Sequence, residues 1–399
     1  MLTDKQMQRY ADVLLWALKT ARRGAFQKNE IVAIHYHRPA IVLAETLFAK
    51  LLEMGLHPVQ QMLPTPVMET DFYSLANRRQ LTFIPPGDRK LHEQLNGRIF
   101  LYAPESITHL GGIDPRRIGV TAVARKFLRD ILTRREAKGL FGWTLCIYPT
   151  EELARQSGLS PKAYCRQVVR SCFLDRRRPL QQWQRVHGEI QAIKQRLGRL
   201  SIRRLRIESD HSDLEITPGE RRKWLGLSGR NIPSFEVFLS PDWRGTRGVY
   251  YADQPSYRSG NSVKEVRLEF KGGRVINARA AEGEKFLRQQ LAMDAGAGRV
   301  GEFSLTDKRF SKINAFMANT LYDENYGGKF GNCHVALGSS YADSYAGKPA
   351  GLTAARKKSL GFNDSALHWD LVNTEKKRVT AHLNGDRSLT LYEDGRFLI

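Results

Sequence analysis

The sequence has 399 residues, with 63 Lys and Arg against 41 Asp and Glu, which gives a formal net charge of +22. Hydrophobic residues make up 41% and charged residues 26%, so the composition is that of a globular protein and excludes a disordered or collagen-like chain. At roughly 100 to 200 residues per domain, this length predicts two or three domains.

The start of the chain and its cysteines indicate a compartment. No stretch reaches the roughly 18 consecutive apolar residues of a membrane span. Asp4 and Asp12 interrupt the region where a signal peptide needs an apolar run. The four cysteines form no CxxC pair and are too scattered for a disulfide framework. We therefore expect a cytoplasmic protein with reduced thiols and no membrane partner.

The first 110 residues alternate helical and strand patterns. Thr3 and Gln6 predict a capping box, and apolar residues then recur at helical spacing. Strand patterns follow at 31–34, 58–63 and 98–102. A helical pattern at 39–54 lies between the first two of them. Strands that alternate with helices predict an α/β domain with a mainly parallel sheet over 1–110.

The region 111–230 continues with helical patterns and is either a separate α/β region or continuous with the N-terminal domain. Its longest pattern, over 180–200, predicts a basic helix. Residues 201–209 and 212–218 then alternate apolar with polar side chains, as half-buried antiparallel strands do.

From residue 231 onward, glycine is frequent and strand patterns dominate. Residues 263–270 alternate cleanly, and KGGRV at 271–275 predicts a hairpin turn. We expect 231–399 to form a catalytic domain that is mixed or antiparallel, β-rich and accompanied by helices. The expected fold class therefore combines α/β and α+β.

The positive charge is densest in three short stretches, at 176–178, 203–206 and 221–223. With Trp183 and Trp224 as stacking groups, they raise the alternative hypothesis of a polyanion-binding or nucleic-acid-binding protein whose metal site is structural or inactive. A solvated surface paired with carboxylates explains the same stretches. No zinc finger, RRM or KH motif accompanies them, so a nucleic-acid partner lacks motif support.

Three local patterns predict chemistry only weakly. GAGRVG at 296–301 matches GxGxxG, but a helical pattern precedes it and an extended one follows, which inverts the order that a dinucleotide site needs. His35 and His37 are compatible with a metal pair, yet no acid stands nearby, and we favour ordinary surface histidines. Cys333 beside His334 is compatible with a nucleophile, and we favour a small buried side chain.

A more specific pattern consists of acids and imidazoles at the edges of apolar or glycine-rich stretches. A lone charge is costly to bury there unless it is paired or metal-bound. The six residues are Glu236, Glu302, Glu324, His334, His368 and Asp370. Their oxygen and nitrogen donors suit two divalent ions, and four negative charges balance two M²⁺. Scattered salt-bridge acids would give the same residues, so the pattern alone leaves both interpretations open.

Five motifs in residues 231–399 resemble, in order and approximate spacing, the metal-dependent aminopeptidase T family, to which aminopeptidase S also belongs. They are NIPSFEVF, GE before an extended run, NTLYDEN, NCHVALG with a tyrosine seven residues after its histidine, and HWD. The first 230 residues resemble the family only in outline, as an α/β domain.

The resemblance implies that the six residues are ligands of two divalent ions, which are zinc, cobalt, manganese or magnesium. It implies that Tyr341 is an active-site tyrosine and that Glu302 bridges the metals or acts as a base. His368 and Asp370, two apart on a predicted strand, point to the same face. The implied activity is release of the N-terminal residue from short peptides, by a homodimer in which the N-terminal domain of one subunit helps enclose the other's active site.

Overall fold

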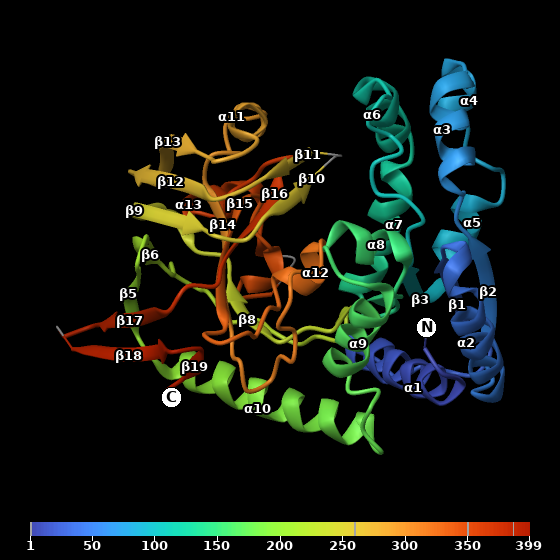
Figure 1. Ribbon diagram of the computed structural model, residues 1–399, viewed down its shortest axis with the longest axis horizontal. Coiled ribbons are helices and arrows are strands. Elements are labelled where there is room, and N and C mark those ends of the chain that lie inside the picture. Colours follow the sequence, from blue (N-terminus) through green and yellow to red (C-terminus); the bar gives the residue numbers. More distant parts are fainter. Residues whose placement is uncertain (1, 259–260, 349–350, 386) are drawn as a thin grey trace. The chain divides into compact units, whose positions relative to one another are not determined.

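The computed structural model describes residues 2–258, 261–348, 351–385 and 387–399. Contacts within the chain form two units (Figure 1). Unit 1 comprises the chain up to Trp183 together with Ser228–Ile232, and unit 2 comprises Gln184–Leu227 and Pro233–Ile399. Among the described residues, no helix combines the length and the apolar character needed to cross a membrane.

Unit 1 contains a parallel sheet with the strand order β2-β1-β3-β4-β7. Its strands are β1 (Ile31–Tyr36), β2 (His57–Met62), β3 (Leu95–Tyr102), β4 (Gly142–Ile147) and β7 (Asn231–Ile232). Val32, Ile34, Ile99 and Leu101 are fully buried on β1 and β3 and form part of the core. The predicted α/β fold with a parallel sheet in the N-terminal part is confirmed, and the sheet also includes β4 and β7, which lie beyond residue 110.

Helices connect these strands. The capping box predicted at the first helix is confirmed, since Thr3 Oγ1 accepts from Gln6 N–H (3.3 Å) and Gln6 Oε1 accepts from Thr3 N–H (2.9 Å). His37 Nδ1 accepts a hydrogen bond from Ala103 N–H (3.2 Å), which is an ordinary structural contact. The helices are α1 (Asp4–Ala21), η1 (Arg38–Ala40), α2 (Ile41–Glu53), α3 (Pro66–Leu75), α4 (Arg78–Leu81), α5 (Asp88–Gln94), α6 (Pro115–Ala124), α7 (Lys126–Ala137), α8 (Glu151–Gln156), α9 (Pro161–Ser171) and the start of α10 (Pro179–Arg199).

Unit 2 contains an eight-stranded antiparallel sheet with the order β13-β12-β9-β6-β5-β17-β18-β19. Its strands are β5 (Ile202–Ser209), β6 (Asp213–Thr217), β9 (Asp242–Ala252), β12 (Val266–Lys271), β13 (Arg274–Arg279), β17 (Lys377–Leu383), β18 (Ser388–Glu393) and β19 (Arg396–Phe397). The predicted hairpin at 271–275 joins β12 to β13, and Gly272 and Gly273 supply the left-handed φ values of 55° and 75° that its turn requires.

A second antiparallel sheet of unit 2 has the order β16-β15-β14-β8. Its strands are β8 (Glu236–Leu239), β14 (Val300–Thr306), β15 (Asn332–Gly338) and β16 (His368–Asn373). Unit 2 also contains the strand pair β10 (Ser256–Arg258) and β11 (Asn261–Val263), and the helices α11 (Glu284–Leu291), α12 (Thr320–Asp323), η2 (Ala342–Ser344) and α13 (Ala354–Ser359).

The glycine motif at 296–301 lies between α11 and β14, so a helix precedes it and a strand follows. This order is the inverse of a dinucleotide-binding turn, as predicted. The antiparallel, β-rich character predicted for the C-terminal part is confirmed by both sheets of unit 2.

Candidate metal centre

One face of the four-stranded sheet carries five of the six predicted ligands, namely Glu236, Glu302, His334, His368 and Asp370. In the strand register, Glu302 of β14 lies opposite Ala336 of β15, and Ala336 lies opposite Asp370 of β16. Thr306 of β14 lies opposite Glu236 of β8. Alternate residues of a strand share a face, so Glu302 and Thr306 point the same way, and the small Ala336 leaves room between Glu302 and Asp370.

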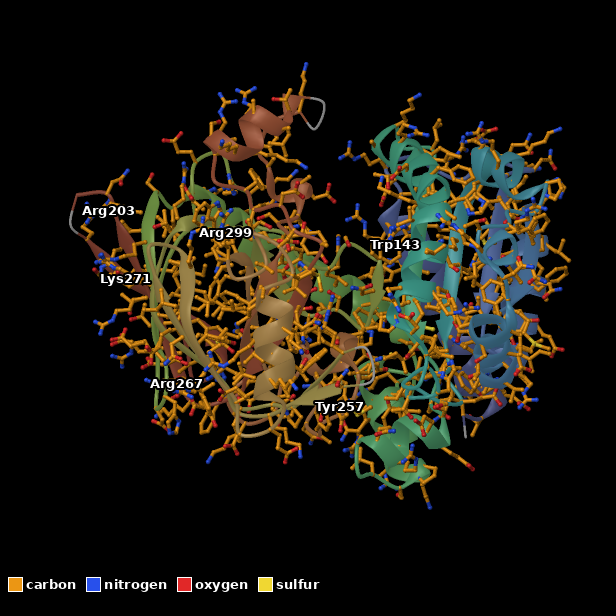
Figure 2. The ribbon with its side chains drawn as sticks, turned by 90° about the horizontal axis from the view of Figure 1, so that it is seen from above. Trp143, Arg203, Tyr257, Arg267, Lys271 and Arg299 are labelled. Atoms are coloured by element: carbon orange, nitrogen blue, oxygen red, sulfur yellow. The ribbon has the colours of Figure 1, made fainter. Side chains whose placement is uncertain are left out.

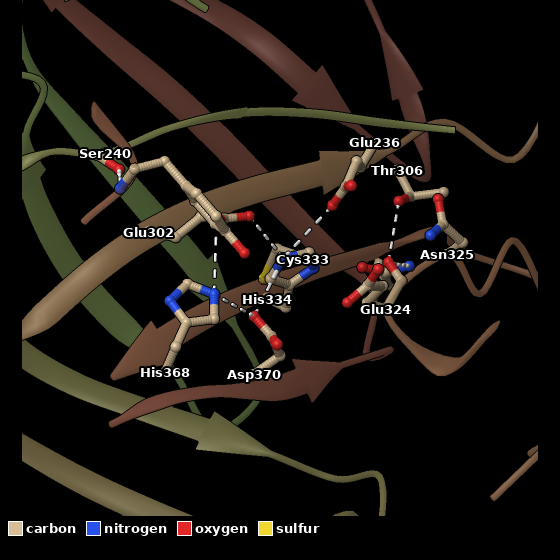
Figure 3. Close-up of polar contacts among 12 residues, drawn as sticks. Glu236, Ser240, Glu302, Thr306, Glu324, Asn325, Cys333, His334, His368 and Asp370 are labelled. Carbon is tan, nitrogen blue, oxygen red and sulfur yellow. Dashed lines mark hydrogen bonds and ion pairs between the residues drawn. The ribbon is translucent and has the colours of Figure 1, made fainter. Parts of the chain in front are cut away.

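The His334 imidazole is surrounded by carboxylates (Figure 3). Its Nε2 lies 3.1 Å from Glu302 Oε1, 3.7 Å from Glu236 Oε2 and 3.8 Å from Asp370 Oδ1. One nitrogen carries at most one proton and cannot make a good hydrogen bond to three oxygens at once. The arrangement therefore suits a cation larger than a proton, which several of these side chains can bind at once.

The His368 imidazole joins the same acids from β16. Its Nε2 lies 3.5 Å from Asp370 Oδ1 and 3.8 Å from Glu302 Oε2. Its Nδ1 donates to the Ser339 carbonyl at 2.9 Å. That hydrogen bond turns the Nε2 lone pair of the neutral ring toward the acids, which is the orientation that a metal ligand requires.

Glu236, Glu302 and His334 are buried, His368 and Asp370 are partly exposed, and the pKa values reflect this burial. Burial, followed by the charge of Glu302, raises the pKa of Glu236 to about 8. Burial opposes protonation of His334, but the hydrogen bond to Glu302 and the surrounding carboxylates outweigh it and raise the pKa to about 9. His368 has its pKa raised to about 9 in the same way, chiefly by Asp370. These acids thus require a proton or another cation beside them to offset their charge.

The donor set fits a divalent metal ion. Ligand atoms of Glu236, Glu302 and His334 all lie within 4.8 Å of one another. Among the described residues, Glu302 Oε2 and Ser304 Oγ are buried without a hydrogen-bond partner, although Ser304 lies opposite His334 in the strand register. Buried polar atoms normally have partners, and a bound cation would supply one to unpaired atoms in a cluster of oxygen and nitrogen donors.

Glu324 lies beside this group rather than in direct contact with its histidines. It is buried, and among the described residues no ion pair within 4.0 Å joins its carboxylate to either imidazole. Burial, followed by the carboxylates of Glu236 and Asp370, raises its pKa well above the usual range. The ionisation of Glu324 is therefore linked to that of the carboxylates in this group.

The turn that carries Glu324 is fixed by polar contacts to the sheet. The Glu324 carbonyl accepts from Thr306 Oγ1 (3.2 Å) and from Asn332 Nδ2 (3.1 Å). The adjacent Asn325 accepts a hydrogen bond from Phe235 N–H at 2.5 Å. The chain next to Glu324 is thereby tied to the residue that precedes Glu236.

Tyr341 stands in the turn after β15, at the open side of the group. Its ring centroid lies 4.8 Å from that of His368 and 5.8 Å from that of Phe238. The residue is 46% exposed, whereas His334 is fully buried. Desolvation and then the nearby carboxylates, led by Glu302, raise the pKa of Tyr341, so the phenol keeps its proton at neutral pH.

Sequence reasoning missed the polar residues that support this group. Ser304 and Thr306 follow Glu302 at spacings of two and four, so strand alternation itself could have placed them on the same face. Asp323 gave no such signal. Its carboxylate accepts from Met317 N–H and Asn319 N–H, both at 2.8 Å, and so closes the loop before α12.

Known proteins resemble this chain in sequence and in fold. A family model described as thermophilic metalloprotease (M29) matches residues 3–397. Aminopeptidase T of Thermus aquaticus is 27% identical over 308 residues, which are 73% of this chain and 74% of that protein. Aminopeptidase AmpS of Bacillus subtilis is 26% identical over 330 residues, or 75% and 77% of the two chains. The structure of wild-type AmpT from Thermus thermophilus has the same fold, with a TM-score of 0.79 at 21% identity, covering 98% of this chain and 99% of that one.

Proposed function

We propose a function from the premise that this chain belongs to the M29 family of thermophilic metalloproteases. It is a metallo-aminopeptidase that hydrolyses the N-terminal peptide bond of short peptides. The observation that carries the proposal is the buried group in which Glu302 faces both histidines, through Oε1 to His334 and Oε2 to His368. A carboxylate in that position is suited to bridge two ions.

The proposed ligands are Glu236, Glu302, Glu324, His334, His368 and Asp370. Four carboxylates would balance two divalent ions, which supports a count of two, and the mixed oxygen and nitrogen donors suit zinc, cobalt, manganese or magnesium. Such ions supply a water of lowered pKa and polarise the scissile carbonyl.

The residues of the chain would act around that chemistry. Tyr341, protonated at neutral pH, donates a hydrogen bond to the carbonyl oxygen of the substrate as negative charge develops there, a contribution typically worth about 3 to 4 kcal/mol. Glu302 or Glu324 returns a proton to the leaving amine. The free N-terminal amine of the substrate would be a further ligand of the bound ions, and an internal peptide bond has no such amine to offer. The homodimer expected from the family stays a prediction, which a measurement of the molar mass in solution by light scattering would test.

The test is elemental analysis of protein purified without chelator, combined with an assay on short peptides. We expect two divalent ions per chain and release of the N-terminal residue, with both lost after chelation and restored by divalent ions. A chain that hydrolyses these peptides at the same rate without any bound metal would contradict the proposal.

A further inference from the structure

The main chain of Tyr341 is fixed by a set of buried polar contacts that the proposed mechanism does not use. Because the residue is 46% exposed, its two ring contacts cover only part of the side chain. The position of the phenol therefore depends on how firmly the turn itself is held.

Two buried serines hold this turn at both of its ends. Ser240 Oγ accepts a hydrogen bond from Tyr341 N–H at 2.8 Å. Ser240 N–H in turn donates to Ser344 Oγ at 3.1 Å, and Ser344 Oγ donates to the Lys223 carbonyl at 3.0 Å. Both serines are 0% exposed, so water does not compete for these hydrogen bonds.

Arg222 supports Ser240 from behind. Its Nε donates to the Ser240 carbonyl at 2.6 Å, and its Nη2 donates to the Leu360 carbonyl at 2.9 Å. The guanidinium also lies over the Phe362 ring, 3.5 Å from its centroid. A planar fork that holds two carbonyls and stacks on an aromatic ring is a geometry that lysine cannot reproduce.

Ser240 directly follows β8, the strand that carries Glu236. One rigid strand thereby sets the position of both a proposed metal ligand and the tyrosine. A displacement of about 1 Å at a reacting group can cost on the order of 100-fold in rate. We infer that Ser240, supported by Arg222, is a positioning residue that fixes Tyr341 relative to the metal centre. This inference rests on the proposed role of Tyr341.

A double-mutant cycle tests it, with Ser240→Ala, Tyr341→Phe and the combination. Removal of one oxyanion donor typically lowers kcat by about 100-fold to 1000-fold, which we expect for Tyr341→Phe. Ser240→Ala should lower kcat by about tenfold with little change in KM, because a loosened donor is lost only in the transition state. In the Tyr341→Phe background, the same serine substitution should change kcat less than about twofold.

Two measurements besides turnover accompany the cycle. Metal content per chain should stay at the wild-type value in all three variants. Affinity for a phosphinic dipeptide, a mimic of the tetrahedral intermediate, should fall in Ser240→Ala by the same factor as kcat/KM. Ser171→Ala is the matched control, since Ser171 is also 0% exposed and donates to the Val168 carbonyl (3.1 Å) in α9, and it should leave kcat unchanged.

Arg222→Lys provides a second variant if Ser240→Ala does not fold. It should lower kcat in the wild-type background and change kcat little in the Tyr341→Phe background. An equal loss of kcat from Ser240→Ala in both backgrounds would overturn the inference while leaving the role of Tyr341 intact. If Tyr341→Phe alone leaves kcat unchanged, the tyrosine role and the positioning inference both fail, and the metal-dependent activity of the wild type still stands.

Discussion

The two antiparallel sheets of unit 2 use the same charged residue types in opposite ways. On the eight-stranded sheet, acids meet arginines across strands, as in Arg206 with Asp213 (2.9 Å) and Arg378 with Glu393 (2.5 Å). On the four-stranded sheet, acids meet other acids around two imidazoles, with Glu302 only 4% exposed at its side chain. In both sheets polar and apolar residues alternate along the strands, so this alternation does not distinguish exposed ion pairs from a buried group of acids.

The difference lies in burial and partners. An exposed ion pair changes the free energy of unfolding by about 0 to 1 kcal/mol, because water screens it. Buried acids without a basic partner are costly and persist only when a cation or proton neutralises them. A cluster of acids in a buried, unpaired setting therefore points to function more strongly than the number of charges does.

The same contrast bears on the net charge of +22. Arg203, Arg267 and Lys271 are exposed on β5 and β12 of the eight-stranded sheet (Figure 2). In the stretch 221–223, by contrast, Arg222 is half-buried against main-chain carbonyls, and desolvation lowers its pKa to about 10. The basic stretches of the sequence thus contain both exposed cations and cations whose hydrogen bonds stabilise the fold. The alternative of polyanion binding receives no support from Arg222.

The largest effect is expected when one buried acid of the four-stranded sheet is removed. Glu302→Gln keeps the shape of the side chain and removes the charge that faces both histidines. We expect loss of bound metal and a fall in kcat/KM of more than about 1000-fold, since roughly 4 kcal/mol of transition-state stabilisation is lost. Elemental analysis and peptide hydrolysis measure both effects.

The control is Glu208→Gln on the eight-stranded sheet, where Glu208 pairs with Arg206 at 3.2 Å. It should retain metal and activity. Equal losses in the two variants would show that the buried and the exposed acids do not differ in function.

A smaller effect concerns the pH dependence of the metal-free protein. The folded-state pKa values of Glu236 (about 8) and His334 (about 9) are raised, so folding favours their protonated forms. Their stabilising contributions are complete below the unfolded pKa values of 4.5 and 6.5 and are lost as pH rises through about 8 and 9. The urea concentration at the unfolding midpoint of chelated protein should therefore decrease as the pH is raised from 5 to 9.

Metal-loaded protein should show a weaker fall, because the ions bind the deprotonated ligands. Glu236→Gln should reduce the slope of the chelated protein. A chelated protein as stable at pH 9 as at pH 5 would contradict the assigned protonation of the buried group.

The smallest effect is expected from Arg206→Met on the eight-stranded sheet. The substitution removes the pair with Asp213, whose side chain is 61% exposed. The free energy of unfolding should change by less than about 1 kcal/mol and activity should not change. A loss above about 3 kcal/mol in chemical unfolding would mean that this pair behaves like the buried group.

The sequence by itself determined the local structure and the chemical types at the site. Period-two alternation predicted β5, β6 and β12 of the eight-stranded sheet, KGGRV predicted the β12 to β13 hairpin, and the capping box at Thr3 predicted the start of α1. These signals are local, because each depends on residues within a few positions of one another. The residue pattern alone left the six proposed ligands open to a second interpretation as salt-bridge acids, and their assignment as ligands came from the resemblance of their motifs to the aminopeptidase T family.

Only the tertiary structure decided which of these groups meet. The register of β14, β15 and β16 brings Glu302 to His334 and His368 across separations of 32 and 66 residues, and no local pattern encodes that pairing. The contacts of Ser240 and Arg222 to the Tyr341 turn were equally invisible, since a serine and an arginine stretch look like surface in a sequence. Burial and long-range strand register are properties of the packed chain, and they decide whether a charge is a solvated surface group or part of a reactive centre.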